Sequence, residues 1–290
     1  MNPDRQPAVS EPVFPAALVH VIAAGEAWEK AALLATLGPP TDHSVWPAPI
    51  LPPAPGRAPR HRVADEPPRR RQGLGHPHGR LLFFHALHHI ELSAIDLAAA
   101  CCWWGSGMPA EFHADFLDIA REEASHAALI EDLLVRRGFP PGSAPVHHRL
   151  WQTARRCQDL GDHLVAVPRV LEARGLDITA SLIDRLRTAD VEAAAVLDRI
   201  YADEIRHVAA GTRWHSRWCQ ERSLDPGQHF HAVCERILAG EPASPFPLDL
   251  VGRRAAGFSE AELQDLQQQN QVGGRPQVAV RPTIPSVRQA

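Results

Sequence analysis

Apolar residues recur at helical spacing from Gly79 to Glu221, in long segments that contain few prolines. This periodicity predicts amphipathic helices, because residues three and four positions apart share one face of a helix. The predicted helices cover residues 79–104, 109–138, 159–187 and 190–221. Pro168 and Gly175 are expected to kink or weaken the third helix, and residues 138–157 to form a long connection.

The region before these helices has a different composition. Fifteen of the 27 prolines precede Gly79, and they leave room there for one helix, at about Ala16–Leu37. The segment Asp42–His78 is expected to be an extended strap. It contains the basic run Arg69–Arg71, which we interpret as a solvated turn.

Downstream, the sequence predicts short helices at Pro226–Ala239 and after the capping-box sequence Ser259–Glu262. No segment has convincing strand character, so the chain is predicted to be all-α. Two helical hairpins joined by one crossover favour a ferritin-like four-helix bundle. The predicted regions are a Pro-rich extension with one helix at 1–78, a di-metal four-helix bundle at 79–221, a helical extension at 222–271 and a disordered tail at 272–290.

Two E-x-x-H motifs lie on the predicted helices, Glu123 with His126 and Glu204 with His207. On a helix, residues at i and i+3 share a face, so both side chains of one motif can reach the same metal ion. Such a pair arises easily by chance, and taken alone it is a weak signal.

The spacing of two further glutamates makes the motifs informative. Glu91 lies 32 residues before Glu123, and Glu172 lies 32 residues before Glu204. This separation suits facing positions on two antiparallel helices joined by a short loop. The sequence thus repeats the pattern Glu, Glu-x-x-His with the same spacing in both halves.

These acidic residues interrupt apolar helix faces instead of lying on polar ones. A buried carboxylate without a cation or a proton costs several kcal/mol. Four carboxylates and two imidazoles in a bundle core therefore predict two divalent metal ions, and oxygen and nitrogen donors without thiolate favour iron or manganese. The predicted ligands are Glu91, Glu123, His126, Glu172, Glu204 and His207.

Residues next to the motifs have competing interpretations. Glu122 and Asp203 precede the motif glutamates and are interpreted as surface residues, because they rotate off the apolar stripe. Asp177 and Asp198 are the candidates to accept hydrogen bonds from the ligating histidines.

Tyr201 and His88 are candidates for an outer layer around the metal site. Tyr201, the only tyrosine, could carry a radical or form a hydrogen bond to a metal-ligating side chain, although a core aromatic is the preferred interpretation. His88 could donate to Glu91 or be a partly exposed histidine.

Composition argues against several classes of protein, although the arginine run prevents excluding a nucleic-acid substrate. A net charge of −4 gives no reason to expect nucleic acid as a partner. Five cysteines without a C-x-x-C pair indicate buried thiols, Cys101 and Cys102 among them. The strongly apolar stretch Leu97–Trp104 is too short to span a membrane, and the N-terminus lacks the features of a secretion signal. A cytoplasmic protein is expected.

Four segments are similar to an uncharacterised bacterial branch of the ferritin-like superfamily, domain of unknown function 455: HALHHIELSAIDLA, REEASHAALIEDLLVRRG, VLEARGLDIT and LDRIYADEIRHVAAGTRW. The similarity covers about residues 70–260 and includes SPFPLDLVGRRAAGF. It implies a di-iron fold in which the six predicted ligands match the ligand positions of the superfamily. It supplies no substrate.

The leading functional hypothesis is an oxidoreductase that uses two iron or manganese ions to activate dioxygen or peroxide on an unknown small-molecule substrate. An external reductase would be needed, because the sequence has no flavin or nicotinamide motif. The alternatives are iron or peroxide handling without an organic substrate, and a metal-free structural or interaction bundle. A homodimer is compatible with the sequence.

Overall fold

The computed structural model describes residues 13–65, 73–238 and 244–272. Within these ranges the chain is all-helical, and the only strand-like pairing is an isolated bridge between Val63 and Val146. The helices in chain order are α1 (Val13–Ala23), α2 (Ala27–Ala35), α3 (Pro77–Trp104), α4 (Ala110–Arg136), α5 (Arg149–Ala154), α6 (Leu160–Leu164), the π-helix η1 (Val165–Glu172), α7 (Ala173–Ala189), α8 (Val191–Gln220), α9 (Pro226–Leu238), α10 (Leu250–Ala255) and α11 (Glu260–Val272).

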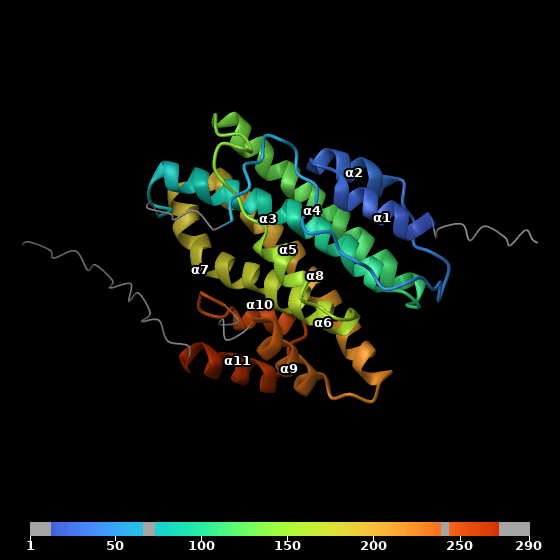
Figure 1. The fold of residues 1–290 in the computed structure, drawn as a ribbon. Helices are drawn as coiled ribbons and strands as arrows, with labels where there is room; N and C mark the ends of the chain where they lie inside the picture. The colour runs from blue at the N-terminus through green and yellow to red at the C-terminus, as the bar shows by residue number, and fades with distance from the viewer. Residues whose placement is uncertain (1–12, 66–72, 239–243, 273–290) are drawn as a thin grey trace, which may run out of the picture.

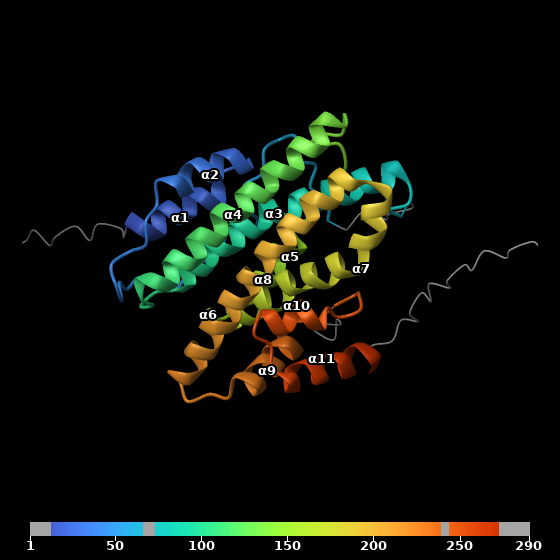
Figure 2. The same cartoon turned by 180° about the vertical axis from the view of Figure 1, so that it is seen from behind.

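Two packed groups of helices form the centre of the molecule. Helices α3 and α4 pack along one another, while η1 and α7 pack against α8. Helix α4 also contacts α8 and so joins the two groups. The N-terminal helices cover the α3–α4 side, and α9–α11 cover the opposite side (Figures 1 and 2). The first, second and fourth of the long helices predicted from periodicity are present, with ends shifted by two residues or fewer.

The third predicted helix is not a regular helix. It consists of α6, η1 and α7, and Pro168 lies inside the π-helical segment. Proline has no N–H to donate and its ring crowds the preceding turn, which accounts for the wider turn. Gly211 of α8 admits the ring, since a Cβ there would lie 2.4 Å from Pro168 Cβ and Cγ. Gly175 leaves α7 unbroken.

The single N-terminal helix expected at Ala16–Leu37 is wrong, because the chain forms α1 and α2 with a break between them. The Glu29 carboxylate accepts hydrogen bonds from the N–H groups of Gly25 and Glu26 at 2.8 and 3.0 Å, and so starts a new helix. Gly25 also lies so close to the strap that a Cβ would be 2.7 Å from the Ala58 nitrogen. A continuous helix would lose both features.

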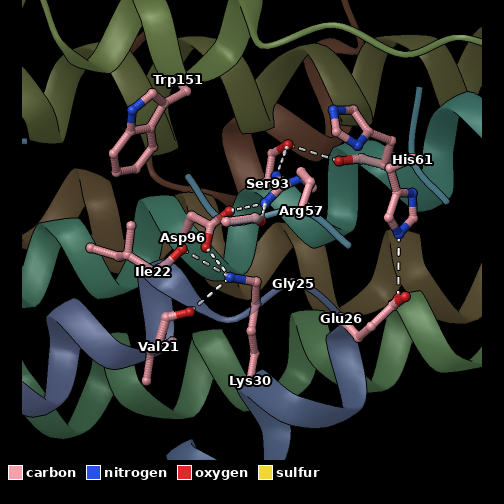
Figure 3. A network of polar contacts seen from close by, with 12 residues as sticks. Val21, Ile22, Gly25, Glu26, Lys30, Arg57, His61, Ser93, Asp96 and Trp151 are labelled. Carbon is pink, nitrogen blue, oxygen red and sulfur yellow. Dashed lines mark hydrogen bonds and ion pairs between the residues drawn. The ribbon is translucent and has the colours of Figure 1, made fainter. Parts of the chain in front are cut away.

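Buried charges dock α2 and the strap onto α3. Lys30 Nζ donates to Asp96 Oδ1 at 2.6 Å and to the Val21 carbonyl at 2.7 Å (Figure 3). Arg57 of the strap donates to Asp96 Oδ2 at 2.7 Å and to Ser93 Oγ at 2.9 Å. One carboxylate of α3 thus holds two segments that are distant in sequence.

The C-terminal helices bury a core of their own against η1 and α8. Phe230, Phe258 and Leu266 pack with apolar residues of η1. Helices α9 and α11 match the two predicted segments, and Ser259 and Glu262 form the expected capping box. Two short helices were not predicted: α10, and α5, which lies inside the predicted long connection. The run Arg69–Arg71 and the tail from residue 273 lie outside the described residues.

Helix α3 combines length with apolar composition. It is long and apolar enough to cross a membrane, yet 72% of its most apolar window is buried inside the protein. The apolar part of α3 is therefore longer than the stretch Leu97–Trp104 identified from the sequence. A core helix accounts for this composition. Cys101 and Cys102 are buried free thiols on this helix, as expected.

Candidate metal centre

The structure brings acidic and imidazole side chains from three helices into one buried cluster. Glu91 comes from α3, Glu123 and His126 from α4, and Glu204 and His207 from α8. All five residues are less than a tenth exposed. One ligand atom from each of Glu91, Glu123, His126 and Glu204 lies within 4.8 Å of the others, so this group could hold a metal ion.

Glu123 lies between the two histidines and is the centre of the cluster. Its Oε1 is 2.9 Å from His207 Nδ1, and its Oε2 is 3.3 Å from His126 Nδ1. The two imidazole rings are stacked with centroids 5.8 Å apart. Glu91 Oε2 lies 3.7 Å from His126 Nδ1. The Nδ1 atoms of both histidines therefore point into the cluster.

The two remaining glutamates have carboxylate oxygens without a partner. Oε2 of Glu204 and Oε2 of Glu172 are shielded from solvent and have no hydrogen-bond partner. Buried polar atoms are almost always satisfied in folded proteins, so such oxygens call for a proton or a cation. The oxygen and nitrogen donors fit divalent metal ions such as iron or manganese.

Glu172 occupies the last position of η1, where the backbone departs from a regular α-helix. Its residue surface is half-buried, and its charge interacts with Glu123 and His207. It lies outside the group of four whose ligand atoms are within 4.8 Å of one another. The structure thus places it beside the cluster, and less tightly than the other glutamates.

The electrostatics of the cluster favour protons on most of its members. Burial and the charge of Glu123 raise the pKa of Glu91 to about 8 and the pKa of Glu172 to about 7. The same causes raise the pKa of Glu204 well above its usual value. Burial opposes the charge of His126, but hydrogen bonds to Glu123 and Glu91 outweigh it and raise the pKa.

Glu123 itself behaves in the opposite way. Burial would raise its pKa, but the hydrogen bond to His126 and the charge of His207 outweigh burial and lower it. One ionised carboxylate is thereby held between two charged imidazoles. Metal ions and protons favour the same positions, so a metal that binds here must displace protons.

A second layer of carboxylates holds the outer nitrogen of each histidine. His126 Nε2 is 3.0 Å from Asp203 Oδ2, and His207 Nε2 is 2.7 Å from Glu122 Oε2. The pairs cross between helices, because α4 supplies the acid for the histidine of α8 and α8 supplies the acid for the histidine of α4. Arg206 donates to both acids. Each Nε2–H is therefore fixed outward, which leaves Nδ1 to face the cluster.

These outer carboxylates correct the sequence interpretation. Glu122 and Asp203 were interpreted as surface residues, and their side chains are indeed 34% and 23% exposed, yet both hold a buried histidine. The candidates proposed from sequence serve elsewhere: Asp177 binds Arg253, and Asp198 binds Arg187. A signal was present, because both motifs have an acidic residue before the glutamate, in Glu122-Glu123 and Asp203-Glu204.

The other two sequence candidates contact the surroundings of the cluster. The Tyr201 hydroxyl donates to Asp249 Oδ2 at 2.5 Å, toward the C-terminal segment. His88 stacks on His61 of the strap with centroids 6.1 Å apart, and its Nε2 lies 3.6 Å from Glu131. Both side chains tie segments together at positions one helical turn from a ligand candidate.

The comparisons with known proteins give a family without an assigned activity. A family model described as "Protein of unknown function (DUF455)" matches residues 16–264. An uncharacterized protein of Haemophilus influenzae is 34% identical over 192 residues, which are 62% of this chain and 65% of that protein. The match thus spans slightly less than two thirds of the relative's length. No solved structure gives a significant match. This chain is a member of the family of proteins of unknown function DUF455.

Proposed function

We propose that this protein is a di-metal carboxylate protein of the ferritin-like type, most simply a di-iron oxidoreductase that activates dioxygen or peroxide. One observation carries the proposal: Glu123 lies between the Nδ1 atoms of His126 and His207, with Glu91 and Glu204 in the same cluster. The partnerless oxygens of Glu172 and Glu204 support two cations instead of one. The arrangement of α3, α4, α8 and the η1–α7 segment is compatible with a ferritin-like bundle.

The two ions would be held by six residues: Glu91, Glu123, His126, Glu172, Glu204 and His207. Glu123 faces both histidines and is the central acid of this set, and Glu204 has a ligand atom in one group with Glu91 and His126. Manganese fits the same donors, and the choice of iron rests on the reaction that we propose.

A reduced pair of such ions supplies two electrons to dioxygen or peroxide, which is the chemistry that the bound metals would contribute. The chain contributes positions, protons and exclusion of water. Glu91 and Glu204 are less than a tenth exposed, so the centre is shielded from bulk solvent. Their carboxylic protons leave when a cation binds, and the same carboxylates can take protons back when negative charge develops at the centre.

The outer carboxylates set the direction of each imidazole. Asp203 and Glu122 accept the Nε2–H groups, so both histidines keep Nδ1 directed at the centre, where its proton would leave when a metal ion binds. They also lie near solvent. Glu122 and His207 line an open hollow of about 510 Å³ between α4 and α8, which Arg206 and Arg213 flank. In this proposal an external reductase approaches the centre from this side.

The proposal is tested by dioxygen uptake after anaerobic loading with ferrous iron. The parent protein is expected to consume dioxygen in proportion to its bound iron, with a new charge-transfer absorption band. Glu123→Gln should bind less iron and abolish the band, whereas the matched surface variant Asp198→Asn should behave like the parent. Iron bound without dioxygen uptake would contradict the oxidoreductase assignment.

Iron or peroxide handling without an organic substrate is the second candidate, and the same preparation tests it. Rapid decay of added peroxide without any reductant would favour it. A parent protein that binds no iron or manganese would leave only the structural or interaction bundle. Size measurement in solution tests the homodimer.

A further inference from the structure

The π-helix that carries Glu172 is held from its outer side by the C-terminal helices. Arg169 lies on η1 three residues before Glu172, and it is 1% exposed. Its Nη2 donates to Glu262 Oε1 of α11 at 2.5 Å. Phe230 of α9 and Phe258 lie against the guanidinium, with ring centroids 4.6 and 4.8 Å from Cζ. We call Arg169, His215, Phe230, Phe258 and Glu262 the Arg169 socket.

The fifth member of the socket comes from α8. Arg169 Nη1 donates to His215 Nδ1 at 2.9 Å. Because a guanidinium has no acceptor, His215 must keep its proton on Nε2, which then donates to His229 Nδ1 at 2.9 Å. His215, Cys219 and His229 have ligand atoms within 4.8 Å of one another. The protonated Nε2 makes this group a hydrogen-bond chain that supports Arg169 and disfavours a metal site.

Burying an arginine side chain costs free energy unless a counter-charge lies beside the guanidinium. Glu262 supplies the counter-charge, and the aromatic faces of Phe230 and Phe258 add cation–π attraction. On the other side of η1, Pro168 fits against Gly211 of α8. The π-helical turn is therefore clamped between α8 and the C-terminal helices.

Glu172 needs such a clamp. It ends a π-helical segment, and its Oε2 is buried without a partner. An irregular turn with a costly buried carboxylate persists only when its surroundings hold it in place. We propose that the C-terminal helices serve the metal centre, and that Arg169 is a positioning residue that keeps Glu172 directed at it. This inference rests on the proposed metal centre.

Metal stoichiometry and hydrogen exchange test the proposal together. Arg169→Gln removes the charge that the socket holds. Arg236→Gln is the matched control, because it breaks the Arg236–Asp162 pair between α9 and α6 without touching η1. The parent and Arg236→Gln should bind two ferrous ions per chain. Arg169→Gln should bind one ion normally, with the second weakened about tenfold or more.

Hydrogen exchange on the metal-free proteins distinguishes a local effect on η1 from a general loss of stability. Amides of residues 165–172 should exchange about tenfold faster in Arg169→Gln, while those of α3 stay unchanged. Arg169→Lys keeps a positive charge for Glu262 and should restore part of the affinity for the second ion. If Arg169→Gln fails to fold, Glu262→Gln should show the same loss in weaker form.

Two irons at parental affinity with unchanged exchange of residues 165–172 in Arg169→Gln would overturn the inference. For Glu262→Gln, the same result would overturn it as well. A parent that binds no metal would refute the proposed function instead. The exchange measurement on η1 would then still decide whether Arg169 positions this segment.

Discussion

Two buried polar clusters of this protein differ in how completely their members satisfy one another. In the first, Asp96 binds Lys30 through one oxygen and Arg57 through the other, and all three side chains are 4% exposed or less. In the second, Glu91, Glu123, Glu172 and Glu204 share two histidines, and two carboxylate oxygens have no partner.

The difference separates structure from function. Both oxygens of Asp96 are bound by cations of the protein, and the Lys30–Asp96–Arg57 cluster fastens α2 and the strap to α3 (Figure 3). The second cluster has four carboxyl groups and only two imidazoles to match them. Buried acids of this kind weaken the fold unless they bind something from outside. Substitutions in and around the two clusters test this difference.

The largest effect is expected for Asp96→Asn in the Lys30–Asp96–Arg57 cluster. The substitution leaves Lys30 and Arg57 buried without a counter-charge, so the free energy of unfolding should fall by about 3–5 kcal/mol. Chemical denaturation measures it, with Asp198→Asn as the exposed control. A loss below about 1 kcal/mol would show that the cluster is not a major fastening point.

The acidic cluster predicts that the metal-free protein loses stability as pH rises. Burial raises the pKa of Glu91 to about 8 and the pKa of Glu172 to about 7, so the folded chain keeps protons that the unfolded chain releases above about pH 4.5. Burial also lowers the pKa of several histidines, His85 and His113 among them, to about 4, and these groups oppose the decrease until the unfolded histidines lose their protons near pH 6.5. The free energy of unfolding should therefore decrease between about pH 7 and 8, by up to about 1.4 kcal/mol per pH unit for each retained proton.

The slope identifies the groups responsible. Glu91→Gln should flatten the decrease, and saturating ferrous iron should reverse it, because bound metal displaces the protons. A stability that stays level or rises over this pH range in the metal-free parent would contradict the assigned charge states.

The outer carboxylates should affect metal binding more than folding. In Glu122→Ala and Asp203→Ala, a histidine Nε2–H loses its acceptor, so metal affinity should fall by about 10–100-fold. Titration with ferrous iron measures the change, and Asp198→Ala serves as control since it pairs with Arg187 at the surface. Equal affinities in the variants and the control would remove Glu122 and Asp203 from the site.

Tyr201→Phe should have the smallest effect. It removes the hydrogen bond to Asp249, which contributes about 1 kcal/mol to stability, and leaves metal stoichiometry unchanged. Thermal unfolding and metal analysis of the same preparation provide the check. Loss of iron binding or of dioxygen uptake in this variant would instead support the alternative from the sequence analysis, in which Tyr201 acts beside the metal ions.

Periodicity and spacing along the sequence predict the helices and the residues that share a helix face. The long helices follow from apolar positions three and four residues apart, and equal spacing of Glu91–Glu123 and Glu172–Glu204 predicts which side chains meet. The crossed pairs of Asp203 and Glu122 depend on how α4 and α8 face each other. The acidic residue before each motif glutamate marks these carboxylates in the sequence, but no pattern along one helix says which histidine each of them holds.

Other differences also arise from tertiary contacts. The break near Gly25 depends on the approach of Ala58 from the strap. Pro168 predicts an irregular helix, but the π-helical form of this segment depends on Gly211, which lies 43 residues further along the chain. Such long-range packing requires the fold before it can be recognised.

The most direct test of the central claim combines metal content and stability in Glu204→Gln. The parent, loaded anaerobically with ferrous iron, should contain about two irons per chain by plasma mass spectrometry. Glu204→Gln should contain fewer, while its metal-free form is as stable as the metal-free parent or more so, because a repelled carboxyl is gone. A parent without stoichiometric metal, or a Glu204→Gln protein destabilised as strongly as Asp96→Asn, would contradict the account.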